Sequence, residues 1–181
     1  MKNKYAVLVV DMLNDFVTGA LKCDRGLAIV TKKKELLEGA REKGVPVIFC
    51  NDAHLKDIDH ELKLWGNHAI IGTKGAEVIP ELGLCEKDYV VPKRRYSGFF
   101  QTDLKLLLDE LGVDTVIMTG LHTHMCVRHT SADAYQYGYN VLVAKDATDS
   151  FTEEDYNYGI KYLKDTYGAE ISDVDSILKK F

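Results

Sequence analysis

Short apolar segments alternate with longer amphipathic segments along the chain, and this alternation predicts the elements of the fold. The apolar segments are rich in β-branched residues and predict six strands, at residues 5–10, 45–49, 89–91, 115–119, 140–144 and 169–172. The amphipathic segments repeat apolar residues at i, i+3 and i+4 and predict four helices, at residues 29–43, 102–111, 127–137 and 152–167. Thr102 and Thr152 stand at N-cap positions, and a glycine follows each helix.

The order of these elements indicates the fold class. Strands that are apolar almost throughout and alternate with helices indicate a parallel sheet covered on both faces. We therefore expect an α/β fold, a three-layer αβα sandwich with a central six-stranded, mainly parallel sheet. The length of 181 residues suits one domain, residues 1–181. Ligands of such sheets bind beyond the carboxyl ends of the strands, so we expect the functional residues to follow the strands directly.

Charge and composition narrow the kinds of partner. Twenty-three basic against 28 acidic residues leave a net charge of −5, and no basic run is longer than the three residues of Lys32-Lys33-Lys34. This balance argues against a nucleic-acid partner and leaves a small-molecule substrate as the expected one. The apolar run at residues 6–10 is far shorter than the roughly 20 residues that span a bilayer, so we expect a buried strand there and no membrane partner.

The cysteines and tyrosines bear on location and assembly. The four cysteines are widely separated and lack C-x-x-C spacing, which favours a reducing, cytoplasmic location over a disulfide framework. Seven of the ten tyrosines lie between Tyr135 and Tyr167. A homo-oligomer with a tyrosine-rich interface and simple packing along two helices both account for this clustering, so the oligomeric state stays open.

A long segment after the second predicted strand, residues 51–76, gathers metal-ligand side chains. Asp52 and three imidazoles, those of His54, His60 and His68, lie there within 17 residues. This set suits Zn²⁺, Fe²⁺ or Mn²⁺, and Asp52 and His54 point the same way if the backbone is extended. The alternative is a wet polar loop with unrelated histidines. His124 and His129 lie elsewhere, and we assign them to solvent or to a helix surface.

Cys126 lies where the fourth predicted strand passes into a helix. A helix N-terminus stabilises a thiolate and lowers its pKa, and its free N–H groups can receive an oxyanion. The alternative is a buried, inert cysteine. Asp11 and Lys93 end the first and third predicted strands and reach the same sheet edge, where an acid, a cation and a thiol suit nucleophilic catalysis. Taken singly, Asp11 and Lys93 are equally compatible with surface charges or caps.

Four blocks together resemble the isochorismatase-like cysteine hydrolases, and within them the nicotinamidase/pyrazinamidase branch. The likeness extends over nearly the whole chain and is carried by Leu8-Val-Val-Asp-Met-Leu-Asn-Asp-Phe16, by Asp52-Ala-His54 with His60 and the segment Trp65 to Ala76, by Lys93-Arg-Arg-Tyr-Ser-Gly-Phe99, and by Thr119-Gly-Leu-His-Thr-His-Met-Cys126-Val. The resemblance implies a catalytic triad of Asp11, Lys93 and Cys126.

The same resemblance implies the rest of the site. One divalent metal ion, zinc first and iron or manganese as alternatives, is expected on Asp52, His54 and His68, with His60 as an additional ligand that only some members use. The substrate-binding side chains implied are Phe16, Trp65 and Tyr96. A cis peptide between Leu121 and His122 is implied as well, with the backbone N–H groups of His122 and Cys126 as the oxyanion hole.

The implied reaction is hydrolysis of nicotinamide to nicotinate and ammonia through a thioester on Cys126, as in NAD salvage. The chain departs from nicotinamidases at His122, Thr123 and His124, where small or acidic residues are more usual, and this departure bears on the substrate more than on the chemistry. Two alternatives stay open: a related cysteine hydrolase acting on another small amide, carbamate or vinyl ether, and a non-enzymatic metal-binding or regulatory domain. Retention of Asp11, Lys93 and Cys126 argues against the second alternative.

Overall fold

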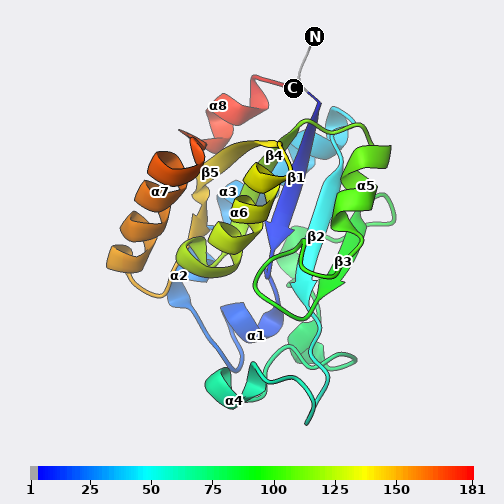
Figure 1. Ribbon diagram of the computed structural model, residues 1–181, viewed down its shortest axis with the longest axis vertical. Helices are drawn as coiled ribbons and strands as arrows, with labels where there is room; N and C mark the ends of the chain where they lie inside the picture. Colours follow the sequence, from blue (N-terminus) through cyan, green and yellow to red (C-terminus); the bar gives the residue numbers. More distant parts are fainter. Residues whose placement is uncertain (1–3) are drawn as a thin grey trace.

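A six-stranded, fully parallel sheet forms the centre of the structure, a computed structural model that describes residues 4–181. Its strands follow the order β3-β2-β1-β4-β5-β6 (Figure 1). Their bounds are β1 (Tyr5–Val10), β2 (Val47–Asp52), β3 (Tyr89–Lys93), β4 (Thr115–Leu121), β5 (Asn140–Asp149) and β6 (Glu170–Ser172). The predicted fold class and all six predicted strands are confirmed.

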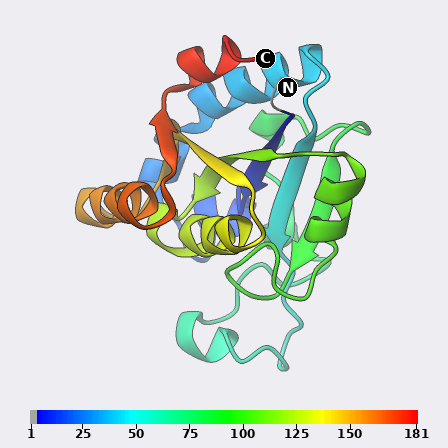
Figure 2. The same ribbon diagram turned by 45° about the horizontal axis from the view of Figure 1, so that its top comes forward.

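Helices cover both faces of the sheet. The α-helices are α1 (Asn14–Val17), α2 (Asp24–Ala28), α3 (Val30–Glu42), α4 (Leu62–Trp65), α5 (Leu104–Glu110), α6 (Arg128–Gln136), α7 (Glu153–Tyr167) and α8 (Val174–Leu178). Two 3₁₀ turns, η1 (Lys74–Ala76) and η2 (Pro80–Leu82), and one π-helical turn, η3 (Thr123–Val127), complete the elements. Helices α3 and α8 lie on one side of the sheet and α6 and α7 on the other, as Figure 2 shows.

The two layers of core meet the sheet through alternate residues of its strands. In β1, Val7 and Val9 pack towards α3 and α8, whereas Ala6, Leu8 and Val10 pack towards α5, α6 and α7. All five side chains are fully buried, which explains why this strand is apolar without alternation. No helix within residues 4–181 combines the length and the apolar character that crossing a membrane requires.

The structure differs from the predicted elements at the carboxyl ends of the strands, and it adds the helices α1, α2, α4 and α8, which were not predicted. Strands β2 and β3 continue to Asp52 and Lys93, which pair with each other in the sheet register. The apolar pattern stops before these residues because they are polar, yet both are buried, at 1% exposure each. At α5 the N-cap position belongs to Asp103 and not to Thr102, whereas Thr152 caps α7 as predicted, by accepting a hydrogen bond from the Asp155 N–H.

One glycine next to the site is required by the close approach of two strands. Gly120 of β4 has a φ of 110°, and a Cβ atom there would lie 2.0 Å from the carbonyl oxygen of Val10 in β1. No other residue fits at that distance without moving one strand. The contact brings the ends of β1 and β4 together, and with them Asp11 and the segment that carries Cys126.

Candidate active site and metal centre

Asp11, Lys93 and Cys126 converge at the carboxyl edge of the sheet, although β3 and β1 are not adjacent strands. Lys93 reaches across β2, and its Nζ donates hydrogen bonds to Asp11 Oδ2 at 2.7 Å and to Asp52 Oδ1 at 2.5 Å. The Asp52 N–H donates to the other oxygen of Asp11 at 2.8 Å. Asp11 and Lys93 are 0% and 1% exposed, so they are neither surface charges nor surface caps.

The Cys126 thiol lies against this ion network. It belongs to the π-helical turn η3, between β4 and α6, and its Sγ lies within 4.8 Å of a carboxylate oxygen of Asp11 and of Asp52. Burial raises the pKa of the Cys126 thiol well above its usual value; Lys93 opposes this rise, and Asp11 and Asp52 add to it. This direction is opposite to the lowering expected at a helix start, because burial and two nearby carboxylates outweigh the effect of Lys93.

Asp11 is the group placed to take the thiol proton. Burial, followed by repulsion from Asp52, raises the pKa of Asp11 to about 6, against the opposing effect of Lys93. A carboxylate of raised pKa is a stronger base than an ordinary aspartate and also a usable acid near neutral pH. We call Asp11, Lys93 and Cys126 the nucleophile cluster. In this cluster the thiol stays protonated at rest, and Asp11 can accept its proton when a substrate is attacked.

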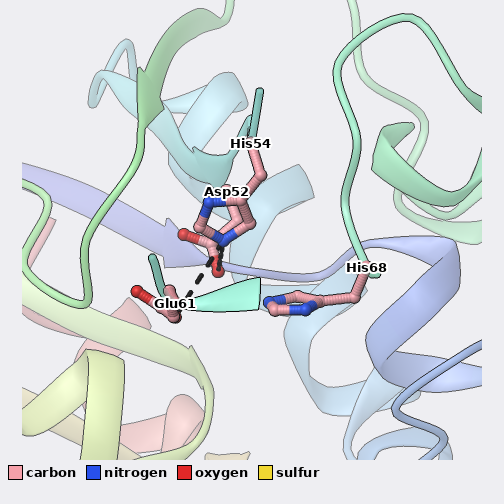
Figure 3. A group of neighbouring side chains, drawn as sticks. All are labelled: Asp52, His54, Glu61 and His68. Carbon is pink, nitrogen blue, oxygen red and sulfur yellow. Dashed lines mark ion pairs between the residues drawn. The ribbon is translucent and has the colours of Figure 1, made fainter. Parts of the chain in front are cut away.

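A second group of side chains lies beside the first and can hold a metal ion. Its members are Asp52 at the end of β2, His54 two residues later, Glu61 just before α4, and His68 beyond α4 (Figure 3). One donor atom of each lies within 4.8 Å of the others, and all four residues are buried. We call these four residues the donor cluster.

The donor atoms of this cluster have the free lone pairs that a metal needs. Asp52 Oδ2 and His54 Nε2 are buried and have no hydrogen-bond partner among the described residues, 4–181. They lie 3.6 Å apart, and His54 Nε2 lies 3.9 Å from Glu61 Oε1. Four ligands around one ion at about 2.1 Å stand roughly 3.4 Å apart, so these spacings approach those of a tetrahedral site.

Hydrogen bonds on the outer side of both histidines orient their rings. His54 Nδ1 lies 3.0 Å from a carboxylate oxygen of Asp59, and His68 Nδ1 lies 2.9 Å from the carbonyl oxygen of Gly66. Each acceptor favours a proton on Nδ1 and leaves Nε2 unprotonated, which is the usual arrangement around metal-bound imidazoles. The residues present therefore fit a divalent ion with two nitrogen and two oxygen ligands.

The pKa values of the donor cluster are shifted because two carboxylates are buried close together. Burial, with Asp52 adding to it, raises the pKa of Glu61 to about 7. Burial also lowers the pKa of His68, and thereby keeps its imidazole neutral. Burial alone would raise the pKa of Asp52, but Lys93 holds that pKa below its usual value. A cation among these groups would favour the ionised form of both carboxylates.

Glu61 takes the place that the sequence interpretation reserved for His60. Asp52, His54 and His68 come together as expected, whereas His60 is exposed and is not part of the donor cluster. The turn that precedes α4 points residue 61 inward and residue 60 outward. A search for ligands among the histidines misses the Glu61 carboxylate. The position of Glu61 next to His60 was the only feature of the sequence that could have indicated it.

A small apolar cavity lies over Cys126. Phe16, Trp65 and Tyr96 line it as expected, and the Trp65 indole N–H donates a hydrogen bond to the Tyr96 hydroxyl at 2.9 Å. Phe151 is a further wall that the sequence interpretation did not name, and its ring stacks on Trp65 with 6.2 Å between centroids. The cavity volume is about 10 Å³, close to that of one water, so a substrate ring enters only when wall side chains move apart.

The segment before Cys126 has the backbone that the resemblance implies. The peptide bond between Leu121 and His122 is cis. The oxyanion role of the His122 and Cys126 N–H groups stays a prediction. His124 Nδ1 lies 3.0 Å from the Ser150 hydroxyl, and His129 Nδ1 lies 2.8 Å from the Met125 carbonyl oxygen, so neither belongs to the donor cluster.

Comparisons with known proteins place these features in context. An isochorismatase domain model matches residues 5–176. The structure is similar to N-carbamoylsarcosine amidase from Thermoplasma acidophilum, with 38% sequence identity, a TM-score of 0.89 and coverage of 95% of this chain and 97% of that one. It is also similar to nicotinamidase PncA from Bacillus subtilis, with 32% identity, a TM-score of 0.88 and coverage of 94% and 99%. The pyrazinamidase of Pyrococcus horikoshii in complex with zinc is similar too, with 32% identity, a TM-score of 0.87 and coverage of 94% and 99%.

Proposed function

Because the chain belongs to the isochorismatase family of hydrolases, we propose that it is a metal-containing cysteine amidohydrolase that converts nicotinamide to nicotinate and ammonia. The observation that carries this proposal is the presence of both clusters around one cavity. Cys126 and the donor residues Asp52, Glu61 and His68 line the same space, together with aromatic walls that suit a flat ring. Nicotinamidase PncA from Bacillus subtilis and the zinc complex of the Pyrococcus horikoshii enzyme support the substrate and the metal.

The first half of the proposed reaction forms a thioester. Asp11 accepts the proton of the Cys126 thiol while Sγ attacks the carboxamide carbon, so the high thiol pKa is no obstacle. Negative charge that develops on the carbonyl oxygen is received by the N–H groups of His122 and Cys126. Asp11 then gives its proton to the departing nitrogen, the carbon–nitrogen bond breaks, and ammonia leaves.

The second half hydrolyses the thioester. Asp11, again a carboxylate, accepts a proton from an incoming water whose oxygen attacks the thioester carbon. The carbon–sulfur bond then breaks, nicotinate leaves, and the proton returns to Sγ. Lys93 stays protonated throughout because Asp11 and Asp52 raise its pKa despite its burial, and it holds Asp11 in place through the 2.7 Å hydrogen bond.

Asp52, His54, Glu61 and His68 would hold the divalent ion, and we expect zinc there. When bound, the ion supplies a Lewis-acidic point that orients the pyridine nitrogen of the substrate. Phe16 and Trp65 pack against the faces of the substrate ring, and Tyr96 keeps the Trp65 indole in position through their hydrogen bond. The scissile carbonyl is thereby left to Cys126.

A second candidate is hydrolysis of a different small amide or carbamoyl compound by the same thiol. The similarity to N-carbamoylsarcosine amidase, at 38% identity, favours it. So does His122, which lines the cavity and is one of the three positions, 122–124, where the chain departs from the small or acidic residues more usual in nicotinamidases.

Ammonia release from nicotinamide by the purified protein tests the proposal. We expect release that falls on treatment with a chelator and returns with zinc, and that is absent in a Cys126→Ala variant. N-carbamoylsarcosine serves as the competing substrate in the same assay. Faster release from N-carbamoylsarcosine than from nicotinamide would establish the second candidate, and full activity after exhaustive chelation would contradict the role given to the metal.

A further inference from the structure

The imidazole of His122 is a buried polar group without a partner in the protein. It is 2% exposed, and neither Nδ1 nor Nε2 has a hydrogen-bond partner within residues 4–181. The other two buried histidines, His54 and His68, each engage one nitrogen with an acceptor of the protein. Buried polar atoms are nearly always paired, so two unpaired nitrogens on one ring require an explanation.

The ring of His122 lies in the wall of the cavity over Cys126. The Phe151 ring stacks against it, with centroids 3.8 Å apart and planes 26° apart, and Phe16 meets it edge-on at 6.2 Å. Burial lowers the pKa of His122 to about 3, so the imidazole is neutral and offers one N–H donor and one lone pair. A phenylalanine would fill the same space and leave no polar atom unpaired.

The position of His122 relative to the donor cluster defines what it can reach. Phe16 contacts His68 at 5.6 Å between ring centroids and His122 at 6.2 Å. A flat substrate packed on Phe16 would therefore lie within reach of both His68, a member of the donor cluster, and His122, which is not a member.

The charge of the surroundings limits the chemistry of the bound group. No lysine or arginine within residues 4–181 lines this cavity, and the nearby cation Lys93 is engaged by two carboxylates. An anionic substituent next to a neutral imidazole would lose its hydration without gaining a counter-charge. An uncharged polar atom, such as a ring nitrogen, loses much less and gains a hydrogen bond.

We propose that the His122 side chain is a specificity-determining residue that hydrogen-bonds an uncharged polar atom of the substrate, separately from the contact made by the donor cluster. A flat heteroaromatic amide with two ring heteroatoms, one for the metal side and one for His122, should then bind more tightly than nicotinamide, which has a single ring nitrogen. The inference rests on the proposed function for the direction in which the substrate faces Cys126. Analogues that lack this polar atom should bind more weakly, since they leave the His122 imidazole without a hydrogen-bond partner.

A nitrogen scan around one ring tests this assignment without turnover. Benzamide, picolinamide, nicotinamide and isonicotinamide have the same shape and differ only in whether and where a ring nitrogen stands. We would measure their dissociation constants by calorimetry on the zinc-loaded Cys126→Ala chain, with and without His122→Phe. We expect His122→Phe to weaken one pyridine isomer about tenfold relative to benzamide, and His122→Asn or His122→Gln to restore part of that loss.

The donor cluster provides the matched control. The isomer that loses affinity in His122→Phe should differ from the isomer that loses affinity in His54→Ala, because His54 belongs to the donor cluster and His122 lies outside it. An equal change in dissociation constant for all four amides would mean that His122 acts by shape alone and would overturn the proposal. The proposal would also be overturned if none of the four amides bound to the chain. If His122→Phe does not fold, His122→Leu removes the same nitrogens with a smaller side chain.

Ammonia release by the chain with Cys126 intact is measured separately, so the two proposals fail in distinguishable ways. An isomer-selective loss of binding without ammonia release would leave the His122 assignment standing and refute the amidase. Ammonia release together with an equal loss of affinity for all four amides would support the amidase and refute the His122 assignment.

Discussion

The nucleophile cluster and the donor cluster lie side by side at the same sheet edge, yet their charges are balanced differently. In the nucleophile cluster the Lys93 cation sits between two carboxylates and is hydrogen-bonded to both. The donor cluster contains no Lys or Arg and leaves Asp52 Oδ2 and His54 Nε2 unpaired. Buried ionised groups need a counter-charge, so the first cluster is complete in the protein's own residues and the second becomes complete with a cation.

Asp52 links the two clusters, because each of its oxygens belongs to a different one. Oδ1 accepts from Lys93, and Oδ2 faces His54. The clusters are therefore separable at Glu61 and His54 and coupled at Asp52. Substitutions at these positions and at the nucleophile measure how far the separation holds.

Cys126→Ala should have the largest effect on turnover. Loss of the nucleophile should lower kcat by at least about a thousandfold, since Asp11 and the proposed oxyanion donors have no covalent route without it. Circular dichroism and zinc content should stay unchanged, because the thiol contributes little volume and binds no metal in this scheme. Cys85→Ala, at an exposed thiol, is the matched control. Activity above a few per cent in Cys126→Ala would refute nucleophilic catalysis by this residue.

Asp52→Asn should alter both clusters, and in opposite senses. Loss of a ligand should weaken zinc binding more than a hundredfold. Asp52 raises the pKa of Cys126, so its removal should lower that pKa and increase the thiolate fraction at neutral pH. Iodoacetamide should therefore alkylate Cys126 faster in the chelator-treated variant than in the chelator-treated parent. Slower alkylation would mean that Asp52 acts mainly by holding Lys93 in place.

Glu61→Gln should affect the donor cluster alone. We expect zinc affinity to fall about 10- to 100-fold and KM to rise, while the rate of Cys126 alkylation stays nearly the same, because the main causes of the Cys126 pKa shift are burial, Lys93, Asp11 and Asp52. His54→Ala should behave alike. His60→Gln is the matched control, one residue away and exposed, and should change neither quantity. If His60→Gln lost zinc and Glu61→Gln kept it, the ligand assignment would have to be reversed.

Tyr96→Phe should have the smallest effect. It removes the partner of the Trp65 indole N–H and leaves both clusters intact, so KM should rise a few-fold with kcat nearly unchanged. Steady-state kinetics with nicotinamide measure the difference. A large fall in kcat would place the Tyr96 hydroxyl in the chemical step instead of the wall.

Much of the nucleophile cluster could be predicted because it depends on a general property of parallel sheets. Asp11 and Lys93 each follow or end a strand, and the carboxyl ends of parallel strands share an edge. Because β2 lies between β1 and β3, Lys93 is close enough to reach across β2 and donate its hydrogen bond to Asp11. The Cys126 pKa could not be predicted this way, since its direction depends on burial and on two carboxylates whose distances exist only in the folded chain.

The sequence by itself determined the alternation of elements and the sheet edge on which the chemistry lies, because these depend on local periodicity and on residues close to strand ends. The clustering of metal-ligand side chains in one loop also indicated three of the four donor residues. Only the tertiary structure decided that Glu61 faces inward, that Asp52 serves both clusters and that His122 stands unpaired beside Phe151. These depend on the path of a loop and on contacts between segments far apart in the chain. No spacing in the sequence encodes them, because side-chain direction outside regular elements is decided by packing.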